Sequence, residues 1–273
     1  MRVKFWGVRG SIPVPGPGTV GVGGNTSCVE IATPDAEALI LDAGTGIYPL
    51  GLDLVRRRGP LPRITLLLSH THWDHIQGLP FFAPVRLAGA RLVIAGERRA
   101  GRTLDQVLAA IMGEPYLPFG LGDLAADVYF VEIEEGKELV VGTCTSVLAA
   151  RVPHPGGALA FRIRCQERSV VYATDVVHPE AGPDPKLVRL AEGADLLVHD
   201  AQLDPGERAS HPDWGHSSWL DAADTARAAG VGQLALFHHA PWRSDEQLER
   251  IEEEARALFP RSFLAREGLE VAT

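Results

Sequence analysis

Residues 69–80, SHTHWDHIQGLP, place three of the chain's ten histidines and one aspartate within six positions. A solvated loop gains nothing from such a cluster, and a hydrophobic core could not bury three histidines beside a carboxylate without partners for each ring. Imidazole nitrogen and carboxylate oxygen, without thiolate, suit zinc, manganese or iron. The cluster therefore predicts four metal ligands, His70, His72, Asp74 and His75.

Further candidate ligands follow other apolar runs. His154 ends SVLAARVPH, Asp175 ends SVVYATD, and His238 follows QLALF. Residues at strand ends converge on one edge of a layered fold, so these three are expected beside the 70–75 cluster. His239 is an alternative ligand. We favour His238 because it directly follows the strand.

Other polar residues at strand ends have less chemical context. Asp42 is expected to be structural or to hold a ligand in place rather than to bind metal. For His199 and Asp200 a supporting role and plain structural hydrogen bonding are equally open, and His178 and His211 are expected at the surface.

The chemistry of such a site follows from its ligands. Two divalent ions about 3.5–4 Å apart would orient an attacking oxygen and stabilise an in-line displacement. Water bound to metal has a pKa near 7, so a metal-bound hydroxide is available without a strong protein base. Because the ions outweigh the charge of Asp74, Asp175 and a hydroxide, a small anionic substrate is favoured. Zinc is the preferred metal, with manganese or iron as alternatives.

Alternating strands and helices must position these residues. Short runs rich in Val, Ile and Leu predict strands at 3–8, 28–33, 38–44, 64–70, 90–96, 146–154, 159–165, 169–175, 195–201 and 233–240. Helical patterns occur at 102–113, 184–193, 217–230 and 244–259. This order predicts a layered α/β sandwich with helices on its outer faces. Residues 112–124 form a Pro- and Gly-rich connection that is either a lid over the site or simple packing.

Composition sets the remaining bounds. The 273 residues are 45% hydrophobic and 22% charged, with a net charge of −9, which does not indicate a broad nucleic-acid-binding face. Three cysteines are too few for a disulfide framework. No secretory signal or membrane span is evident, so a cytoplasmic protein without membrane contact is expected. No linker divides the chain, so residues 1–273 are expected to form one domain, and a homo-oligomer stays open.

HTHWDH resembles the HxHxDH motif of the metallo-β-lactamase superfamily, and LDAGTG resembles the motif that precedes it. The later His, Asp and His occur in the family's order. The resemblance implies a four-layer αββα metallo-β-lactamase sandwich and two metal ions. It implies one ion on His70, His72 and His154, a second on Asp74, His75 and His238, and Asp175 as a bridge.

GHSSWLDAADTARAAGVGQLALFHHA resembles the ribonuclease Z segment in which a catalytic histidine precedes a helix. The resemblance implies catalytic roles for His216 and Asp74. Only twenty residues separate His154 from Asp175, which leaves no room there for a tRNA-clasping arm. A large nucleic-acid substrate is therefore expected to be disfavoured.

The sequence thus predicts a dinuclear metal-dependent hydrolase, and a phosphodiesterase for small or cyclic phosphodiesters is favoured. One alternative is a lactone, carboxyl-ester or thioester hydrolase on the same metal site. Another is a sensory domain that binds metal without turnover.

Overall fold

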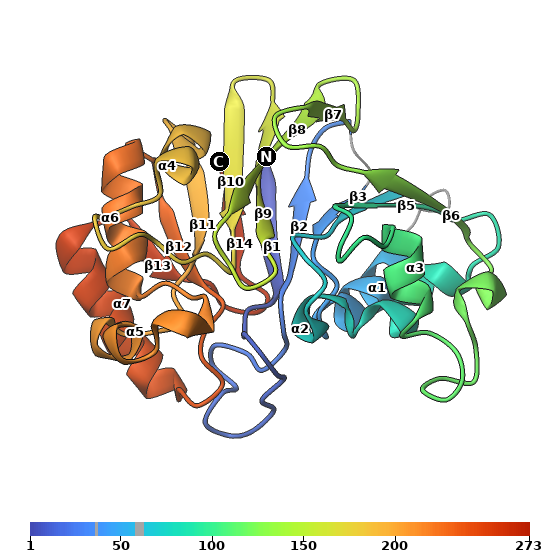
Figure 1. The fold of residues 1–273 in the computed structure, drawn as a ribbon, viewed down its shortest axis with the longest axis horizontal. Coiled ribbons are helices and arrows are strands. Elements are labelled where there is room, and N and C mark those ends of the chain that lie inside the picture. The colour runs from blue at the N-terminus through green and yellow to red at the C-terminus, as the bar shows by residue number, and fades with distance from the viewer. Residues whose placement is uncertain (36–37, 58–62) are drawn as a thin grey trace.

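A computed structural model of the protein describes residues 1–35, 38–57 and 63–273. Within these residues the strands form two seven-stranded sheets that face each other, and helices cover both outer faces (Figure 1). The predicted four-layer αββα sandwich is confirmed. The expectation that residues 1–273 form a single domain stays a prediction.

The first sheet has the order β14-β1-β2-β3-β4-β5-β6. From β3 to β6 its strands run parallel, whereas β14, β1, β2 and β3 are antiparallel neighbours. Its strands are β1 (Arg2–Gly7), β2 (Cys28–Ala32), β3 (Ala38–Leu41), β4 (Arg63–Leu67), β5 (Arg91–Gly96), β6 (Asp127–Glu132) and β14 (Glu270–Ala272).

The second sheet has the order β13-β12-β11-β10-β9-β8-β7. Strands β10 to β13 are parallel, and β7 to β10 are antiparallel. Its strands are β7 (Glu138–Val140), β8 (Thr145–Val152), β9 (Ala158–Cys165), β10 (Arg168–Ala173), β11 (Leu196–Asp200), β12 (Leu234–Phe237) and β13 (Ser262–Leu264).

Helices from each half lie over their own sheet, as Figure 1 shows. The first half contributes α1 (Ile47–Arg56), α2 (Trp73–Ile76) and α3 (Leu104–Ala109). The second half contributes α4 (Pro185–Ala191), α5 (Pro205–Ser210), α6 (Trp219–Ala229) and α7 (Asp245–Leu258). None of the helices in the described ranges is both long and apolar enough to cross a bilayer.

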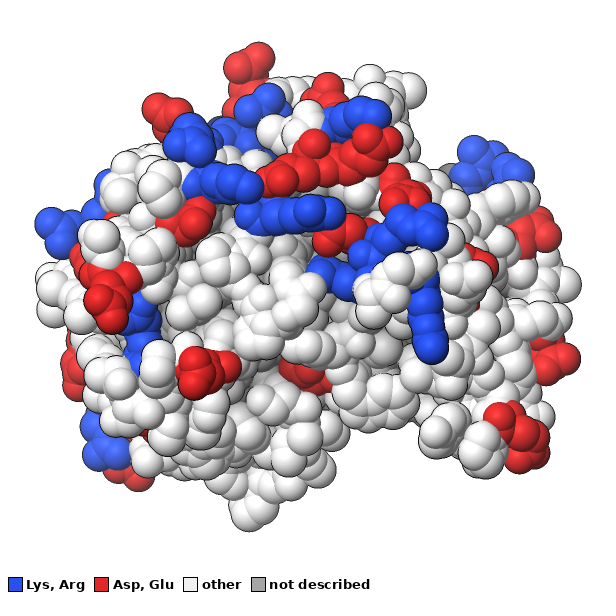
Figure 2. Space-filling view, viewed as in Figure 1, with Lys and Arg blue, Asp and Glu red and all other residues white. Residues whose placement is uncertain are grey.

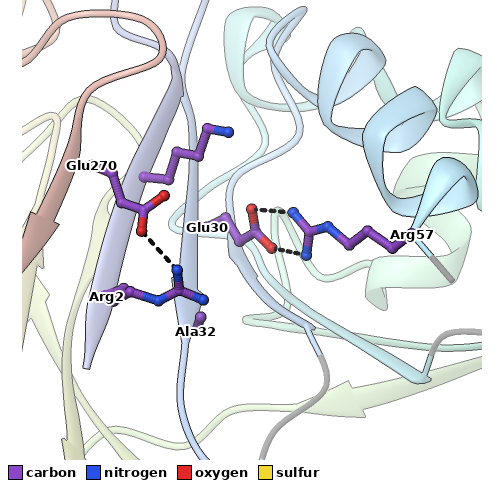
Figure 3. Close-up of a pocket in the computed structure, with 6 residues that line it drawn as sticks. Arg2, Glu30, Ala32, Arg57 and Glu270 are labelled. Atoms are coloured by element: carbon purple, nitrogen blue, oxygen red, sulfur yellow. Dashed lines mark hydrogen bonds and ion pairs between the residues drawn. The ribbon is translucent and has the colours of Figure 1, made fainter. Parts of the chain in front are cut away.

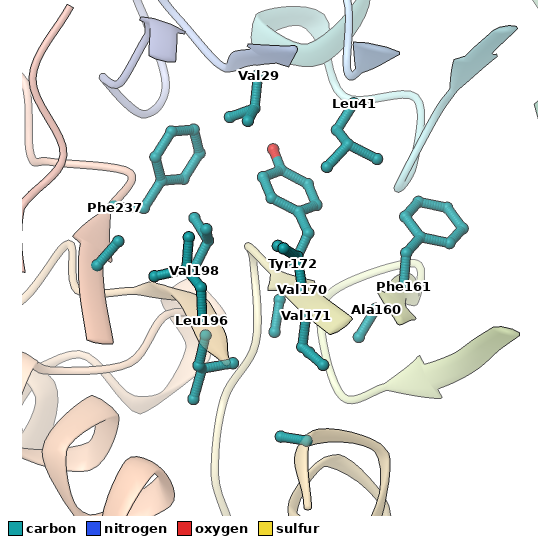
Figure 4. Close-up of a cluster of buried hydrophobic side chains, with 14 of the residues drawn as sticks. Val29, Leu41, Ala160, Phe161, Val170, Val171, Tyr172, Leu196, Val198 and Phe237 are labelled. Carbon is teal, nitrogen blue, oxygen red and sulfur yellow. The ribbon is translucent and has the colours of Figure 1, made fainter. Parts of the chain in front are cut away.

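The main hydrophobic core fills the space between the two sheets. Figure 4 shows Val29 and Leu41 of the first sheet facing Phe161, Tyr172 and Phe237 of the second. The hydroxyl of Tyr172 points out of this core toward the first sheet (Figure 4). A buried tyrosine needs a hydrogen-bond partner. The hydroxyl of Tyr172 donates to Asp42, which lies at the carboxyl end of β3.

The parallel blocks decide where functional side chains gather. Strands β3 to β6 and β10 to β13 each end at one edge of their sheet, and the loops that follow them meet there. Helix α2, which directly follows one of these loops, marks this edge at the bottom of Figure 1.

The last strand of the chain completes the first sheet. Strand β14 pairs antiparallel with β1 in the register Arg2↔Ala272 and Lys4↔Glu270. The edge of β1 that faces away from β2 is therefore covered by residues from the other end of the sequence.

Candidate metal centre

Asp175 lies at the centre of the histidines predicted as ligands. Its Oδ1 is 3.8 Å from His70 Nε2 and 3.5 Å from His154 Nε2. Its Oδ2 is 3.1 Å from His75 Nε2 and 3.2 Å from His238 Nε2. The two oxygens of one carboxylate thus face two different pairs of imidazoles, as expected of a bridging residue.

Among the described residues, the predicted ligands fall in two groups of atoms that could each hold an ion, and a third group joins Asp175 and His238 to Asp200 and His216. Within each group, the atoms lie no more than 4.8 Å apart. The first group is His70, His72, His154 and Asp175, and the second is Asp74, His75 and His238. The structure therefore brings together all seven residues predicted as ligands, in the two sets that the family resemblance implied.

The two adjacent histidines after β12 point to different places. His238 Nε2 lies 3.2 Å from Asp74 Oδ2, within the second group. His239 Nε2 is 2.9 Å from the carbonyl oxygen of Ala265, and burial lowers the pKa of His239 to about 3. His239 is thus a neutral, buried histidine outside both groups.

A left-handed backbone conformation directs three of these side chains toward the centre. Asp42, Asp175 and His238 have φ values of 61°, 53° and 59° at the ends of β3, β10 and β12. Residues other than glycine rarely adopt this region, which costs about 1–3 kcal/mol and concentrates at functional sites. At each strand end the chain turns sharply and aims a polar side chain into the shared edge.

Asp42 supports the second group by contacting the ring nitrogen of His75 that faces away from Asp175. Its Oδ2 is 2.8 Å from His75 Nδ1 and accepts hydrogen bonds from Ser69 Oγ and Tyr172 Oη, each 2.8 Å long. Its Oδ1 accepts from the Ser69 amide at 2.7 Å. These contacts fix the tautomer and orientation of His75, so its Nε2 faces the centre. Asp42 is itself fully buried.

His216 lies on the opposite side of the centre, paired with Asp200. His216 Nδ1 is 2.8 Å from Asp200 Oδ2, and its ring stacks on that of His238 at 5.1 Å between centroids. Burial alone would lower the pKa of His216, but the charge and hydrogen bond of Asp200 raise it to about 9. Ser218 caps α6, so His216 has no capping role in that helix.

The donor set fits divalent cations. The buried nitrogen His70 Nε2 has no hydrogen-bond partner among the described residues. Burial, followed by the charge of His75, lowers the pKa of His70, which keeps that ring neutral as a ligand must be. The buried aspartates at this edge have histidines as their nearest titratable neighbours, so neutral imidazoles leave the carboxylate charge to be balanced by cations.

Substrate access is open beside the first group. A pocket of about 180 Å³ there is lined by His70, Thr71, His72, Arg99, Ala100, Pro155, Gly156 and Gly157. Arg99 Nη1 donates to the carbonyl oxygens of Gly156 and Gly157, and its Nη2 donates to that of Ser69. The guanidinium therefore anchors the loop after His154 against the loop after β4.

Replacing Asp42 with asparagine is expected to lower the free energy of unfolding by about 3–5 kcal/mol, because an amide cannot accept all of these hydrogen bonds and leaves a buried pair broken. Urea denaturation measures the change. Tyr172→Phe is the matched control: it removes one of the donors and should cost about 1 kcal/mol. A smaller loss of unfolding free energy for Asp42→Asn than for Tyr172→Phe would contradict the role of Asp42 as the support of His75.

The burial of His178 differs from the prediction, and the role of Tyr172 was not predicted. His178 was expected at the surface but is buried, because its ring stacks on His199 and its Nδ1 accepts from the Asp184 amide. The sequence reasoning also overlooked Tyr172. Its signal was a hydroxyl within an otherwise apolar strand, which must find a buried partner.

Comparison with known proteins gives the family. The model of the β-lactamase superfamily domain matches residues 38–239. Ribonuclease BN of Escherichia coli O1:K1 / APEC is 32% identical, over 83% of this chain and 86% of its own length. Ribonuclease Z of Synechococcus sp. (strain CC9605) is 27% identical, over 99% of this chain and 97% of its own. The metallo-β-lactamase fold protein YhfI from Bacillus subtilis superposes with a TM-score of 0.73 at 20% identity, over 99% of each chain.

These relatives correct one prediction. The expectation that a large nucleic-acid substrate is disfavoured is wrong, because the chain is similar over most of its length to enzymes named as ribonucleases. It rested on the short span between His154 and Asp175 and on the net charge of −9. Net charge is an average over the molecule: Figure 2 shows Lys and Arg, with Asp and Glu among them, across the upper part of one face. Electrostatic recognition depends on such local distributions.

Three observations agree on the family: the two facing sheets, the histidines clustered at their shared edge, and the ribonuclease relatives. The chain belongs to the metallo-β-lactamase superfamily, as a hydrolase with ribonuclease Z-like relatives, in a fold that implies divalent metal ions.

Proposed function

We propose that this protein is a dinuclear metal-dependent phosphodiesterase. The observation that carries the proposal is the position of Asp175, whose two oxygens each face one imidazole pair. His70, His72 and His154 would hold one ion, Asp74, His75 and His238 the other, and Asp175 both. Zinc is favoured by this set of imidazoles and carboxylates. When bound, the ions would supply a hydroxide nucleophile and positive charge for the transition state.

The residues of the chain supply the remaining requirements of phosphodiester cleavage. Asp200 holds His216 through Nδ1, which leaves Nε2 free to give a proton to a leaving oxygen. Asp74 is fixed by the Ser11 amide, which donates to its Oδ2 at 2.8 Å, so the carboxylate cannot swing away from the site. Buried carbon around these groups lowers the local dielectric and strengthens their action on developing charge.

The phosphodiester assignment draws support from the relatives and from His216. An alkoxide leaving group needs a proton, whereas a thiolate departs without one. A histidine held beside the ligand groups is therefore more useful for a phosphodiester than for a thioester.

A substrate panel tests this function. The zinc-loaded protein should hydrolyse bis(p-nitrophenyl) phosphate, cyclic nucleotides or a short oligoribonucleotide with higher kcat/KM than simple lactones and thioesters, and chelation of the metal should stop it. Higher kcat/KM for lactones or thioesters would replace the proposal by an ester hydrolase. A fully metallated protein inactive on the whole panel would favour a sensory domain instead.

A further inference from the structure

The five tryptophans divide sharply by exposure. Trp219 is 9% exposed, and Trp6 is half-buried against the hydrophobic core under the first sheet. Trp73, Trp214 and Trp242 are 54%, 44% and 48% exposed. These three lie in or beside the loops that follow β4, β11 and β12, at the edge that carries the metal centre. Large aromatic side chains left in solvent beside a site indicate a ligand surface.

Two of these tryptophans form one surface with a histidine. His211 stacks on Trp214 with ring centroids 4.0 Å apart and planes at 7°. Trp242 meets Trp214 edge-on, at 5.8 Å and 70°. We refer to His211, Trp214 and Trp242 as the aromatic platform. All three members are exposed, so the platform is open to solvent.

The platform adjoins the catalytic groups through the chain itself. Trp214 ends a short 3₁₀ helix, η4 (Pro212–Trp214), and is followed by Gly215 and His216. The carbonyl oxygen of Gly215 is 2.8 Å from Nδ1 of the predicted ligand His154. A Cβ at Gly215 would lie 2.2 Å from Pro155 Cδ, so this backbone is pressed against the loop that carries His154. The Cα atoms of Trp214 and His216 lie within about 7 Å of each other.

The platform is held in place before any ligand arrives. Trp242 Nε1 donates to Glu207 Oε1 at 3.1 Å. Glu207 lies in α5, where its Oε2 accepts from the Asp204 amide and from Arg243. The indole is thus fixed by its polar edge while about half of its surface stays in water. A ring fixed in this way loses little conformational entropy when something stacks on it.

A charged pocket elsewhere on the described surface is occupied by its own ion pairs. Figure 3 shows a pocket of about 270 Å³ at the opposite edge of the first sheet, where Arg2 pairs with Glu270 and Arg57 with Glu30. Its arginines and carboxylates neutralise one another at 2.9 Å and 2.6 Å. Lys4, which also lines this pocket, lies over the Trp6 ring with its Nζ 4.1 Å from the ring centroid.

We propose that the aromatic platform stacks on a nucleobase of the substrate, so that this site cleaves phosphodiesters of nucleotides in preference to those of simple alcohols. The inference rests on the proposed phosphodiesterase function and narrows its substrate class. In a nucleotide the base is joined through its sugar to the phosphate, which matches an aromatic surface beside the catalytic groups. Stacking tolerates every base, because each has a π face.

Paired substrates test the platform. We expect Trp214→Leu and Trp242→Leu to lower the ratio of kcat/KM for the p-nitrophenyl ester of thymidine 5′-phosphate to kcat/KM for ethyl p-nitrophenyl phosphate. The ratio should fall by about 5- to 150-fold, the equivalent of the 1–3 kcal/mol measured for base stacking. Trp242→Phe should keep most of the wild-type ratio of the two kcat/KM values. Tyr129→Leu, which removes an aromatic 47% exposed on β6, is the control and should leave the ratio at the wild-type value.

Binding separates this inference from the proposed function. The dissociation constants of adenosine 5′-monophosphate and methyl phosphate are measured on the same proteins. Tighter binding of the nucleotide by the wild type, lost in both leucine variants, supports the platform even if no diester is cleaved. Equal affinity for the two ligands, or an unchanged kcat/KM ratio in the leucine variants of an active enzyme, overturns it.

Discussion

Replacing Asp175 with alanine is expected to empty both ligand groups and to lower kcat by about 10³-fold or more. Both oxygens of this carboxylate are engaged, one toward His70 and His154 and the other toward His75 and His238. Metal ions contribute several kcal/mol of transition-state stabilisation, and each 1.4 kcal/mol corresponds to tenfold in rate. Metal content after dialysis, measured by inductively coupled plasma mass spectrometry beside the rate, checks both parts.

A matched aspartate separates this loss from a general effect of charge. Asp224 lies on α6 with its carboxylate 47% exposed, paired with Arg227, and Asp224→Ala should leave metal content and rate near wild-type values. The bridging role is excluded if Asp175→Ala retains two tightly bound ions per chain.

His216→Ala is expected to reduce the rate by about 10²–10⁴-fold on diesters with alkyl or ribose leaving groups, the usual contribution of general acid catalysis. Asp200 fixes Nδ1 of this ring, so the other nitrogen is available for the leaving oxygen. A p-nitrophenolate group departs without protonation, so its diester should lose far less. Steady-state kinetics on the two substrate types give the comparison.

Each substrate serves as the control for the other in the same variant. A merely structural His216 would give equal losses on both, and a metal ligand would give a lower metal content. Either result would contradict the proton-donor role. Asp200→Asn should show the same leaving-group dependence with a smaller loss, because it weakens the support of the ring without removing it.

The sequence indicated which polar residues lie together at one edge more completely than it indicated the helices and strands. Strands rich in aliphatic residues, such as β4 and β10, were found, and each is followed within two positions by a polar residue. Helix α1 was missed because Pro49 and Gly51 lie within it. Proline at the third position of a helix loses no intrahelical hydrogen bond, so local propensity misleads there. Strands β13 and β14 have three residues each, too few to show a periodic pattern.

The predicted ligands could be named from local sequence, but the contacts that support them could not. His70 to His75 are neighbours in the chain, and their spacing is itself the signal. The contact of Tyr172 with Asp42 spans 130 positions and crosses from one sheet to the other, so only the packing of the two sheets creates it. The left-handed backbone at Asp175 and His238 could not be predicted either, because neither residue type requires that conformation.

Strand β14 has a consequence for how the protein is made. Its partner β1 is synthesised well before it, so the pairing of Arg2 with Ala272 must wait until residue 272 has been made. Until then one edge of β1 carries unpaired backbone groups, which invite pairing with other chains. A nascent chain halted before residue 270 would therefore keep an open strand edge, and synthesis of residues 270–272 would close it.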